Sequence, residues 1–140
     1  MNSQQKRTIG KIERLLPEIN DFVAPGAKIE VLAEGFGWSE GPVWVDRLDA
    51  LLFSDVPGNK IYQWDKKNGL SIFLSPSGYT GIAPRGNKGS KNAMNRDESG
   101  SNGLILDKNG RLIICMHGDR RVASLDDWVK KGFTTIAGKY

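Results

Sequence analysis

The sequence Ser39-Glu40-Gly41-Pro42-Val43-Trp44 places a carboxylate directly before a glycine and a proline, and then enters an apolar run. Glycine lets the main chain bend or approach a ligand without a Cβ clash, and proline fixes the next φ angle. The Glu40 side chain is therefore predicted to be held in place at the start of a β-strand, as a ligand-binding carboxylate would be. On the residue pattern alone, a solvated carboxylate at the start of a strand explains Glu40 equally well.

This stretch has a counterpart further along the chain. Asn102-Gly103-Leu104-Ile105-Leu106 repeats it, and the spacing between Glu40 and Asn102 is 62 residues. Downstream, Leu112-Ile113-Ile114 follows Leu51-Leu52-Phe53 with a spacing of 61 residues, so one residue is lost in the intervening turn. Self-similarity at a nearly fixed period is typical of repeated β units such as the blades of a β-propeller.

Each copy is predicted to form four antiparallel strands joined by short turns, which is the architecture of one propeller blade. Alternating apolar residues mark the strands, and clusters of Gly, Asn, Asp and Pro mark the turns. The predicted strands comprise residues 43–45, 51–54, 60–64 and 70–74 in the first copy and 104–106, 111–116, 121–125 and 133–137 in the second. The fold class is therefore all-β, with two blades of a propeller.

The segment before the repeats is predicted to be separate from them. Residues 1–27 form an N-terminal segment, in which Pro17 limits any short helix to an end near Leu15. Residues 28–140 form the propeller part, which begins with a half-buried strand at residues 28–33 because polar and apolar side chains alternate there.

The two copies are joined by residues 75–101, which are rich in Gly, Ser, Asn and charged side chains. A loop of this length is uncommon inside a compact domain, so we expect a surface insertion with only its ends ordered. A propeller ring needs at least four blades, so two blades cannot close on themselves. We therefore expect the N-terminal part of a larger propeller, with open strand edges that favour self-association.

The composition argues against several functional classes. The 140 residues have a net charge of +4, without the basic stripe and stacking aromatic residues that nucleic-acid binding requires. Cys115 is the single cysteine, which excludes an internal disulfide and a Cys-rich zinc site, and its apolar neighbours predict a buried, inert thiol. No apolar segment has the length of a signal-peptide core or a membrane span, which predicts a cytoplasmic protein without a membrane partner.

Several motifs occur in a characteristic order along residues 28–140. They are Ser39-Glu40-Gly41-Pro42-Val43-Trp44, the run from Leu52 to Asp65, Pro76-Ser77-Gly78, Ser101-Asn102-Gly103-Leu104 and the run from Cys115 to Val122. Together they resemble the gluconolactonase, regucalcin (senescence marker protein) and luciferin-regenerating-enzyme superfamily. The resemblance implies part of a six-bladed β-propeller and metal-dependent hydrolysis of a sugar lactone to an aldonic acid.

The resemblance also implies roles for two residues of the repeat. In that family the glutamate of the Glu-Gly-Pro-x-Trp motif binds calcium or zinc at the mouth of the central channel, which makes Glu40 a metal ligand by resemblance. Asn102 would face the same channel and contact the substrate or a metal-bound water. Hard divalent cations take carboxylate and amide oxygens, which agrees with both assignments. The family's other ligands, an asparagine and an aspartate, come from later blades that this sequence lacks.

His117 and Arg120 are the remaining candidates for the site. His117 is the only histidine, so it is the candidate for proton transfer, with a structural role in its turn as the alternative. Arg120 is a candidate contact for an anionic sugar acid, with a solvated arginine as the alternative.

Two other interpretations of the chain stay open. A non-catalytic propeller would use its face to bind a protein or a sugar, but a pure scaffold has no need of a carboxylate such as Glu40 at the channel mouth. The chain could also be a truncated, inactive product of a longer reading frame. Further strand repeats encoded after Tyr140 would distinguish this case.

Overall fold

The computed structural model describes residues 7–81 and 98–138, which belong to two units that meet between Glu34 and Gly35 and are described separately. In the first unit, strand β1 (Thr8–Ile9) pairs with strand β2 (Ile29–Glu30) in an antiparallel ladder. Only these two residues of the predicted strand at 28–33 are in β structure.

The helix predicted to end near Leu15 is not found among residues 7–34, the described part of this unit. A single 3₁₀ turn, η1 (Pro17–Asp21), forms instead, with Pro17 at its first position. Proline is favoured there because the first N–H groups of a helix have no intrahelical partner, so the missing donor is not lost. Pro17 therefore starts a helical turn, whereas it was predicted only to end one near Leu15.

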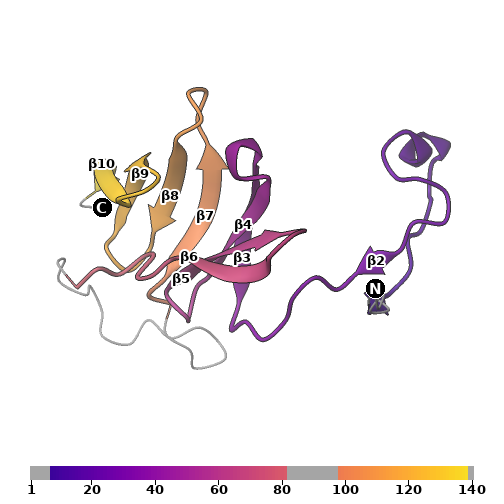
Figure 1. The fold of residues 1–140 in the computed structure, drawn as a ribbon, viewed down its shortest axis with the longest axis horizontal. Coiled ribbons are helices and arrows are strands. Elements are labelled where there is room, and N and C mark those ends of the chain that lie inside the picture. Colours follow the sequence, from indigo (N-terminus) through magenta and orange to yellow (C-terminus); the bar gives the residue numbers. More distant parts are fainter. Residues whose placement is uncertain (1–6, 82–97, 139–140) are drawn as a thin grey trace. The chain divides into compact units, whose positions relative to one another are not determined.

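The second unit contains two four-stranded antiparallel sheets, each a meander of strands that follow one another in the sequence (Figure 1). The strands of the first sheet are β3 (Ser39–Val45), β4 (Ala50–Asp55), β5 (Lys60–Asp65) and β6 (Gly69–Leu74), with the 3₁₀ turn η2 (Asp46–Leu48) between β3 and β4. The strands of the second sheet are β7 (Ser101–Leu106), β8 (Leu112–Met116), β9 (Arg121–Asp127) and β10 (Gly132–Gly138). The eight strands and their grouping confirm the prediction of two blades.

The turns confirm the internal repeat at the level of single residues. The second and third strands of each sheet are joined by four-residue turns, at residues 56–59 and 117–120. The last residue of each turn has a left-handed backbone, with φ of 50° at Asn59 and 52° at Arg120. These two residues are 61 positions apart, which is the spacing found between the apolar strands of the two copies.

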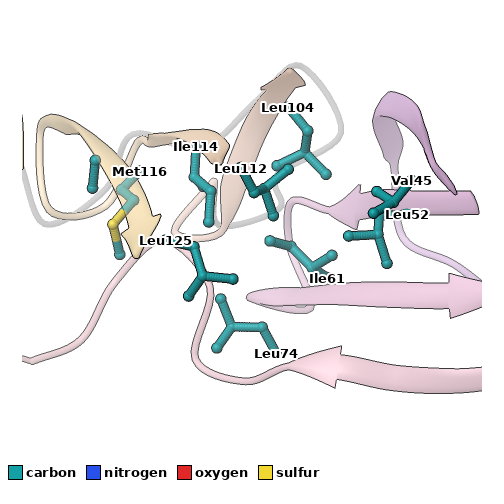
Figure 2. Packing of buried hydrophobic residues seen from close by; sticks show 10 residues of the cluster. Val45, Leu52, Ile61, Leu74, Leu104, Leu112, Ile114, Met116 and Leu125 are labelled. Carbon is teal, nitrogen blue, oxygen red and sulfur yellow. The ribbon is translucent and has the colours of Figure 1, made fainter. Parts of the chain in front are cut away.

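The hydrophobic core lies between the two sheets (Figure 2). Its buried residues are Val45, Leu52, Ile61 and Leu74 from the first sheet and Leu104, Leu112, Ile114, Met116, Ala123 and Leu125 from the second. Successive side chains of a strand point to opposite faces of its sheet, so every second residue of each strand can enter this core. The core therefore joins the two blades and sets how their innermost strands meet.

The same alternation corrects the prediction of a buried thiol at Cys115. In β8, Leu112, Ile114 and Met116 are fully buried against the first sheet. Cys115 lies between the last two and therefore points to the other face, where it is exposed. An apolar neighbourhood in the sequence did not mean a buried position, because the strand is covered on one face only.

The predicted insertion at residues 75–101 lies largely outside the described residues, which include only its two ends, 75–81 and 98–101. Both ends pack close to the innermost strands, as the next section shows. Within the parts of the chain that the structure describes, no helix is long and apolar enough to cross a membrane.

Candidate functional site

Glu40 lies at a β-bulge in β3. Glu40 pairs with Ser54 of β4, whereas the next pair along the ladder joins Val43 to Leu52, so one extra residue is accommodated at Gly41 and Pro42. Gly41 has a positive φ of 57°, which glycine adopts without strain. Pro42 has no main-chain N–H, which is tolerated where the bulge interrupts the ladder. Bulges occur next to active sites because they redirect a side chain. The glycine and proline that follow Glu40 are thus explained by the irregular backbone at this point.

The second blade has a bulge in the equivalent place. Ser101 pairs with Met116 of β8, and the next pair joins Leu104 to Ile114, so that Asn102 and Gly103 take up one extra residue. The two residues that the repeat relates, Glu40 and Asn102, therefore both lie at an interruption of the innermost strand of their blade.

The two bulges meet across the boundary between the blades. A Cβ atom placed on Gly41 would lie 2.6 Å from the main-chain oxygen of Asn102 and 2.7 Å from the main-chain nitrogen of Leu104. The backbones of the two sheets approach each other most extensively between β3 and β7. The structure thus brings Gly41, the residue after Glu40, against the main chain of Asn102. Glu40 is half-buried and Asn102 is exposed.

A cluster of three buried serines fixes this junction. The Ser54 hydroxyl donates to the main-chain oxygen of Asn102 at 2.8 Å and is 2.7 Å from the Ser101 hydroxyl. The Ser101 hydroxyl and its main-chain N–H both donate to the Ser77 hydroxyl, at 3.0 and 3.1 Å. All three serines are fully buried. Since Ser54 is also the ladder partner of Glu40, the cluster links the two candidate residues through hydrogen bonds.

The loop that contributes Ser77 is held by one side chain. The amide oxygen of Asn59 accepts the main-chain N–H groups of Ser77, Gly78 and Tyr79 at 2.8–3.1 Å, and its amide nitrogen donates to the Tyr79 oxygen at 2.9 Å. The Gly78 oxygen in turn accepts the main-chain N–H of Asp119 at 2.7 Å. Asn59 therefore connects the start of the interblade loop to the turn of the second blade.

His117 and Arg120 lie in that turn, at residues 117–120. Because Ser101 pairs with Met116, the turn is at the end of the second sheet where β7 and its bulge begin. The structure therefore places both residues at the same end of the blade as Asn102. Both are exposed, and the left-handed φ of Arg120 strains a side chain with a Cβ atom.

Asp119 anchors this turn. Its side chain is only 2% exposed, and its carboxylate accepts the Thr80 N–H at 3.0 Å and the Thr80 hydroxyl at 2.8 Å, with Arg121 3.2 Å away. The sequence analysis missed Asp119 and the serine cluster. A carboxylate inside a Gly-containing turn could have indicated a structural role for Asp119. Nothing in the sequence indicated that its partner is Thr80, 39 residues earlier.

The candidate metal ligands, Glu40 and Asn102, can be compared with the ligands that a divalent cation needs. Glu40 supplies a carboxylate and Asn102 a side-chain amide, and both offer the oxygen atoms that calcium takes. Calcium needs six to eight such ligands. Within residues 7–81 and 98–138, no three His, Cys, Asp or Glu side chains are grouped so that they could hold a metal ion. The two residues fit as members of a metal shell but do not complete one.

A hollow of about 450 Å³ lies elsewhere on the first blade. It is lined by Leu48, Asp49, Gln63, Asp65, Lys66, Lys67 and Asn68. These residues surround the turns after β3 and β5, which are at the opposite end of the sheet from Glu40. The hollow is therefore separate from the bulge site.

Two consecutive four-stranded meanders that pack face to face, with their innermost strands side by side, define a β-propeller. Residues 38–139 match the family described as the SMP-30/gluconolactonase/LRE-like region, and the chain belongs to this family. The family and the fold class predicted from the sequence motifs are confirmed.

The chain is similar to several gluconolactonases. It is 37% identical over 125 residues to a gluconolactonase of Zymomonas mobilis, and this match covers 89% of the chain and 33% of the relative. An X-ray structure of a provisionally assigned gluconolactonase superposes with a TM-score of 0.66 at 31% identity, covering 89% of this chain and 35% of that protein. A gluconolactonase of Xanthomonas campestris has a TM-score of 0.59 at 22% identity over 81% of this chain and 30% of its own, which shows the shared fold alone. The chain thus spans about a third of the length of these relatives.

Proposed function

We propose that this chain supplies one part of the active site of a metal-dependent hydrolase that converts sugar lactones to aldonic acids. The observation that carries the proposal is the meeting of the two bulges, where Gly41, the residue after Glu40, lies against the main chain of Asn102. Membership of the family and the 37% identity to a gluconolactonase support the reaction class. The reaction is a proposal because the chain spans only a third of that relative.

Glu40 is proposed as one oxygen ligand of a calcium or zinc ion. The main chain of the half-buried Glu40 is held by the ladder pair with Ser54 and by the bulge, so little main-chain freedom has to be lost on binding. A bound divalent ion would polarise the lactone carbonyl and lower the pKa of the attacking water. Asn102 is proposed to orient the substrate, because its amide offers both a donor and an acceptor beside Glu40.

The turn at residues 117–120 is proposed to supply a group for proton transfer and a positive charge that binds the product carboxylate. His117 carries the only imidazole of the sequence, a group that can both accept and donate a proton in acid–base catalysis. Arg120 places a permanent positive charge at the same end of the blade, which suits the carboxylate formed when a lactone ring opens. Asp119 supports both by fixing the turn against Thr80.

The isolated chain is proposed to be inactive as a metal-dependent lactonase. Glu40 and Asn102 give two oxygen ligands, whereas calcium needs six to eight, and the described residues contain no group of three His, Cys, Asp or Glu side chains that could hold a metal ion. Turnover of an aldonolactone by the 140-residue chain that disappears on chelation would contradict this part of the proposal.

The proposal is tested in a chimera in which residues 38–139 replace the matching segment of the Zymomonas mobilis gluconolactonase. The chimera is expected to hydrolyse gluconolactone, and Glu40→Gln is expected to abolish turnover while the protein stays folded. Asp46→Asn is the matched control, since it removes one exposed carboxylate at the opposite end of the same strand. Equal loss of activity in both variants, or no loss in Glu40→Gln, would refute the assignment of Glu40.

A further inference from the structure

Ser54 is a polar residue on an apolar face. In β4, Leu52 and Ser54 are two positions apart, so both point toward the second sheet, where Leu52 belongs to the hydrophobic core. Ser54 is fully buried, and burying a hydroxyl lowers stability unless the group is hydrogen-bonded. An apolar side chain would fill this place without that requirement, so the groups that the Ser54 hydroxyl contacts explain its presence.

The Ser54 hydroxyl holds the main chain of Asn102. It donates to the Asn102 main-chain oxygen at 2.8 Å and lies 2.7 Å from the Ser101 hydroxyl. The same oxygen lies against Gly41, since a Cβ atom placed there would be 2.6 Å away from it. The Asn102 carbonyl belongs to the second blade but is therefore contacted by two strands of the first, β3 at Gly41 and β4 at Ser54.

The main chain of Ser54 holds the other candidate residue. Glu40 pairs with Ser54 in the ladder between β3 and β4, and this pair adjoins the bulge. Ser54 is thus connected to Glu40 through its main chain and to Asn102 through its side chain. A mutation can separate the two connections, because removal of the hydroxyl leaves the main chain of the ladder pair in place.

We propose that Ser54 is a positioning residue that sets the place of Asn102 relative to Glu40. The inference rests on the proposed function, in which Glu40 binds the metal ion and Asn102 orients the lactone. Without the hydroxyl, the Asn102 carbonyl loses the hydrogen bond from β4, and its amide side chain is held less precisely beside Glu40. A shift of about 1 Å in a group that positions a substrate can lower the rate about 100-fold.

The first experiment compares Ser54→Ala with Ser124→Ala in the chimera that contains residues 38–139. Ser54→Ala is expected to lower kcat/KM for gluconolactone about 10–100-fold. Its calcium affinity, measured by calorimetry, is expected to equal that of the parent, because the ladder pair of Glu40 is kept. Ser124→Ala is the matched control, since Ser124 is also fully buried and its hydroxyl donates to Asp126 at 2.6 Å. The control is expected to keep the parent kcat/KM.

A double-mutant cycle tests whether Ser54 acts through Asn102. In an Asn102→Ala background, Ser54→Ala is expected to cause no further loss of kcat/KM, because the amide that Ser54 positions is gone.

Ser54→Cys is a second variant that does not depend on the stability of Ser54→Ala. A thiol is close to a hydroxyl in size but is a weak hydrogen-bond donor. The chain itself has Cys115 at the equivalent position of the second blade, 61 residues later. Ser54→Cys is therefore expected to fold and to show a loss of kcat/KM similar to that of Ser54→Ala.

The outcomes distinguish this inference from the proposed function. Full turnover and metal affinity in Glu40→Gln would overturn the proposed function and the inference with it. If Glu40→Gln abolishes turnover but Ser54→Ala and Ser54→Cys keep the parent kcat/KM, the positioning role alone is overturned. Additive losses in the cycle with Asn102→Ala, or an equal loss in Ser124→Ala, would show that Ser54 does not act through Asn102 and would also overturn it.

Discussion

Gly41 lies so close to Asn102 that a Cβ atom at Gly41 would be 2.6 Å from the Asn102 main-chain oxygen. This contact joins the first bulge to the second, and it is possible only for glycine. The left-handed φ of 57° adds a second reason, since L-residues with a side chain are strained there.

Gly41→Ala is therefore expected to destabilise the chain by about 2–4 kcal/mol, from left-handed strain together with the overpacked contact. The midpoint of urea unfolding measures this change, at an unchanged slope. Gly110→Ala is the matched control, because Gly110 has a φ of 73° with no atom within 4 Å of the added Cβ. Gly110→Ala is expected to show the destabilisation from left-handed strain alone. Equal losses of stability at the two positions would therefore contradict the close contact between Gly41 and Asn102.

The three hydroxyls of the buried serine cluster are expected to depend on one another rather than to contribute independently to stability. Ser101→Ala leaves the Ser54 and Ser77 hydroxyls with fewer partners in a fully buried site, which should reduce stability by about 1–3 kcal/mol. In a double-mutant cycle, Ser54→Ala combined with Ser101→Ala should lose less than the sum of the two single changes. Strict additivity would show that the two hydroxyls do not act on each other.

The sequence predicted the blades well because their strands follow simple physical rules. Period-two alternation and Gly- or Asn-containing turns located all eight strands of the second unit, and the internal repeat alone related Glu40 to Asn102. The exposed position of Cys115 was missed because hydrophobic neighbours do not reveal which face of a strand is covered.

The bulges were not predicted either, although they create the site. An extra residue in a strand shifts the alternation of its side chains by one place. In the sequence, only the Gly41–Pro42 pair indicated the first bulge. The serine cluster and the bond from Thr80 to Asp119 join residues far apart in the chain, so no local pattern reports them. The roles of Glu40, Asn102, His117 and Arg120 stay predictions.

Arg120 is expected to show opposite effects on stability and on substrate binding. Arg120→Asn should stabilise the chain by about 0.5–1 kcal/mol, because asparagine tolerates the left-handed backbone that Asn59 adopts in the equivalent turn. In the chimera, the same change should raise KM with little change in kcat, as expected for a lost binding contact. Lys108→Asn removes one positive charge from a turn at the other end of the sheet and should leave KM unchanged.

The acid sensitivity of the second blade is expected to depend on Asp107. The main-chain N–H of Arg111 and then its guanidinium group, both at 2.8 Å, hold the pKa of the Asp107 carboxyl below its ordinary value. A carboxyl whose pKa is lowered by folding stabilises the protein above its unfolded pKa, about 3.9, and loses this contribution as the pH falls through the folded pKa.

Asp107→Asn should therefore be less stable than the wild-type chain near neutral pH, and the difference should shrink below about pH 4. Unfolding midpoints in urea, measured for both proteins from about pH 7 down to about pH 3, test this expectation. A difference in stability between the two proteins that stays constant over this pH range would mean that ionisation of Asp107 does not contribute to stability.

The central claim is that Glu40 binds a divalent metal ion, and calorimetry tests it most directly. Calcium and zinc are titrated into the metal-free chimera that contains residues 38–139, into its Glu40→Gln variant and into the Asp46→Asn control. The account predicts that Glu40→Gln weakens binding by more than the roughly 10–100-fold typical of residues that only support a ligand, and that Asp46→Asn binds as the parent does. Unchanged affinity for both metals in Glu40→Gln would contradict the account.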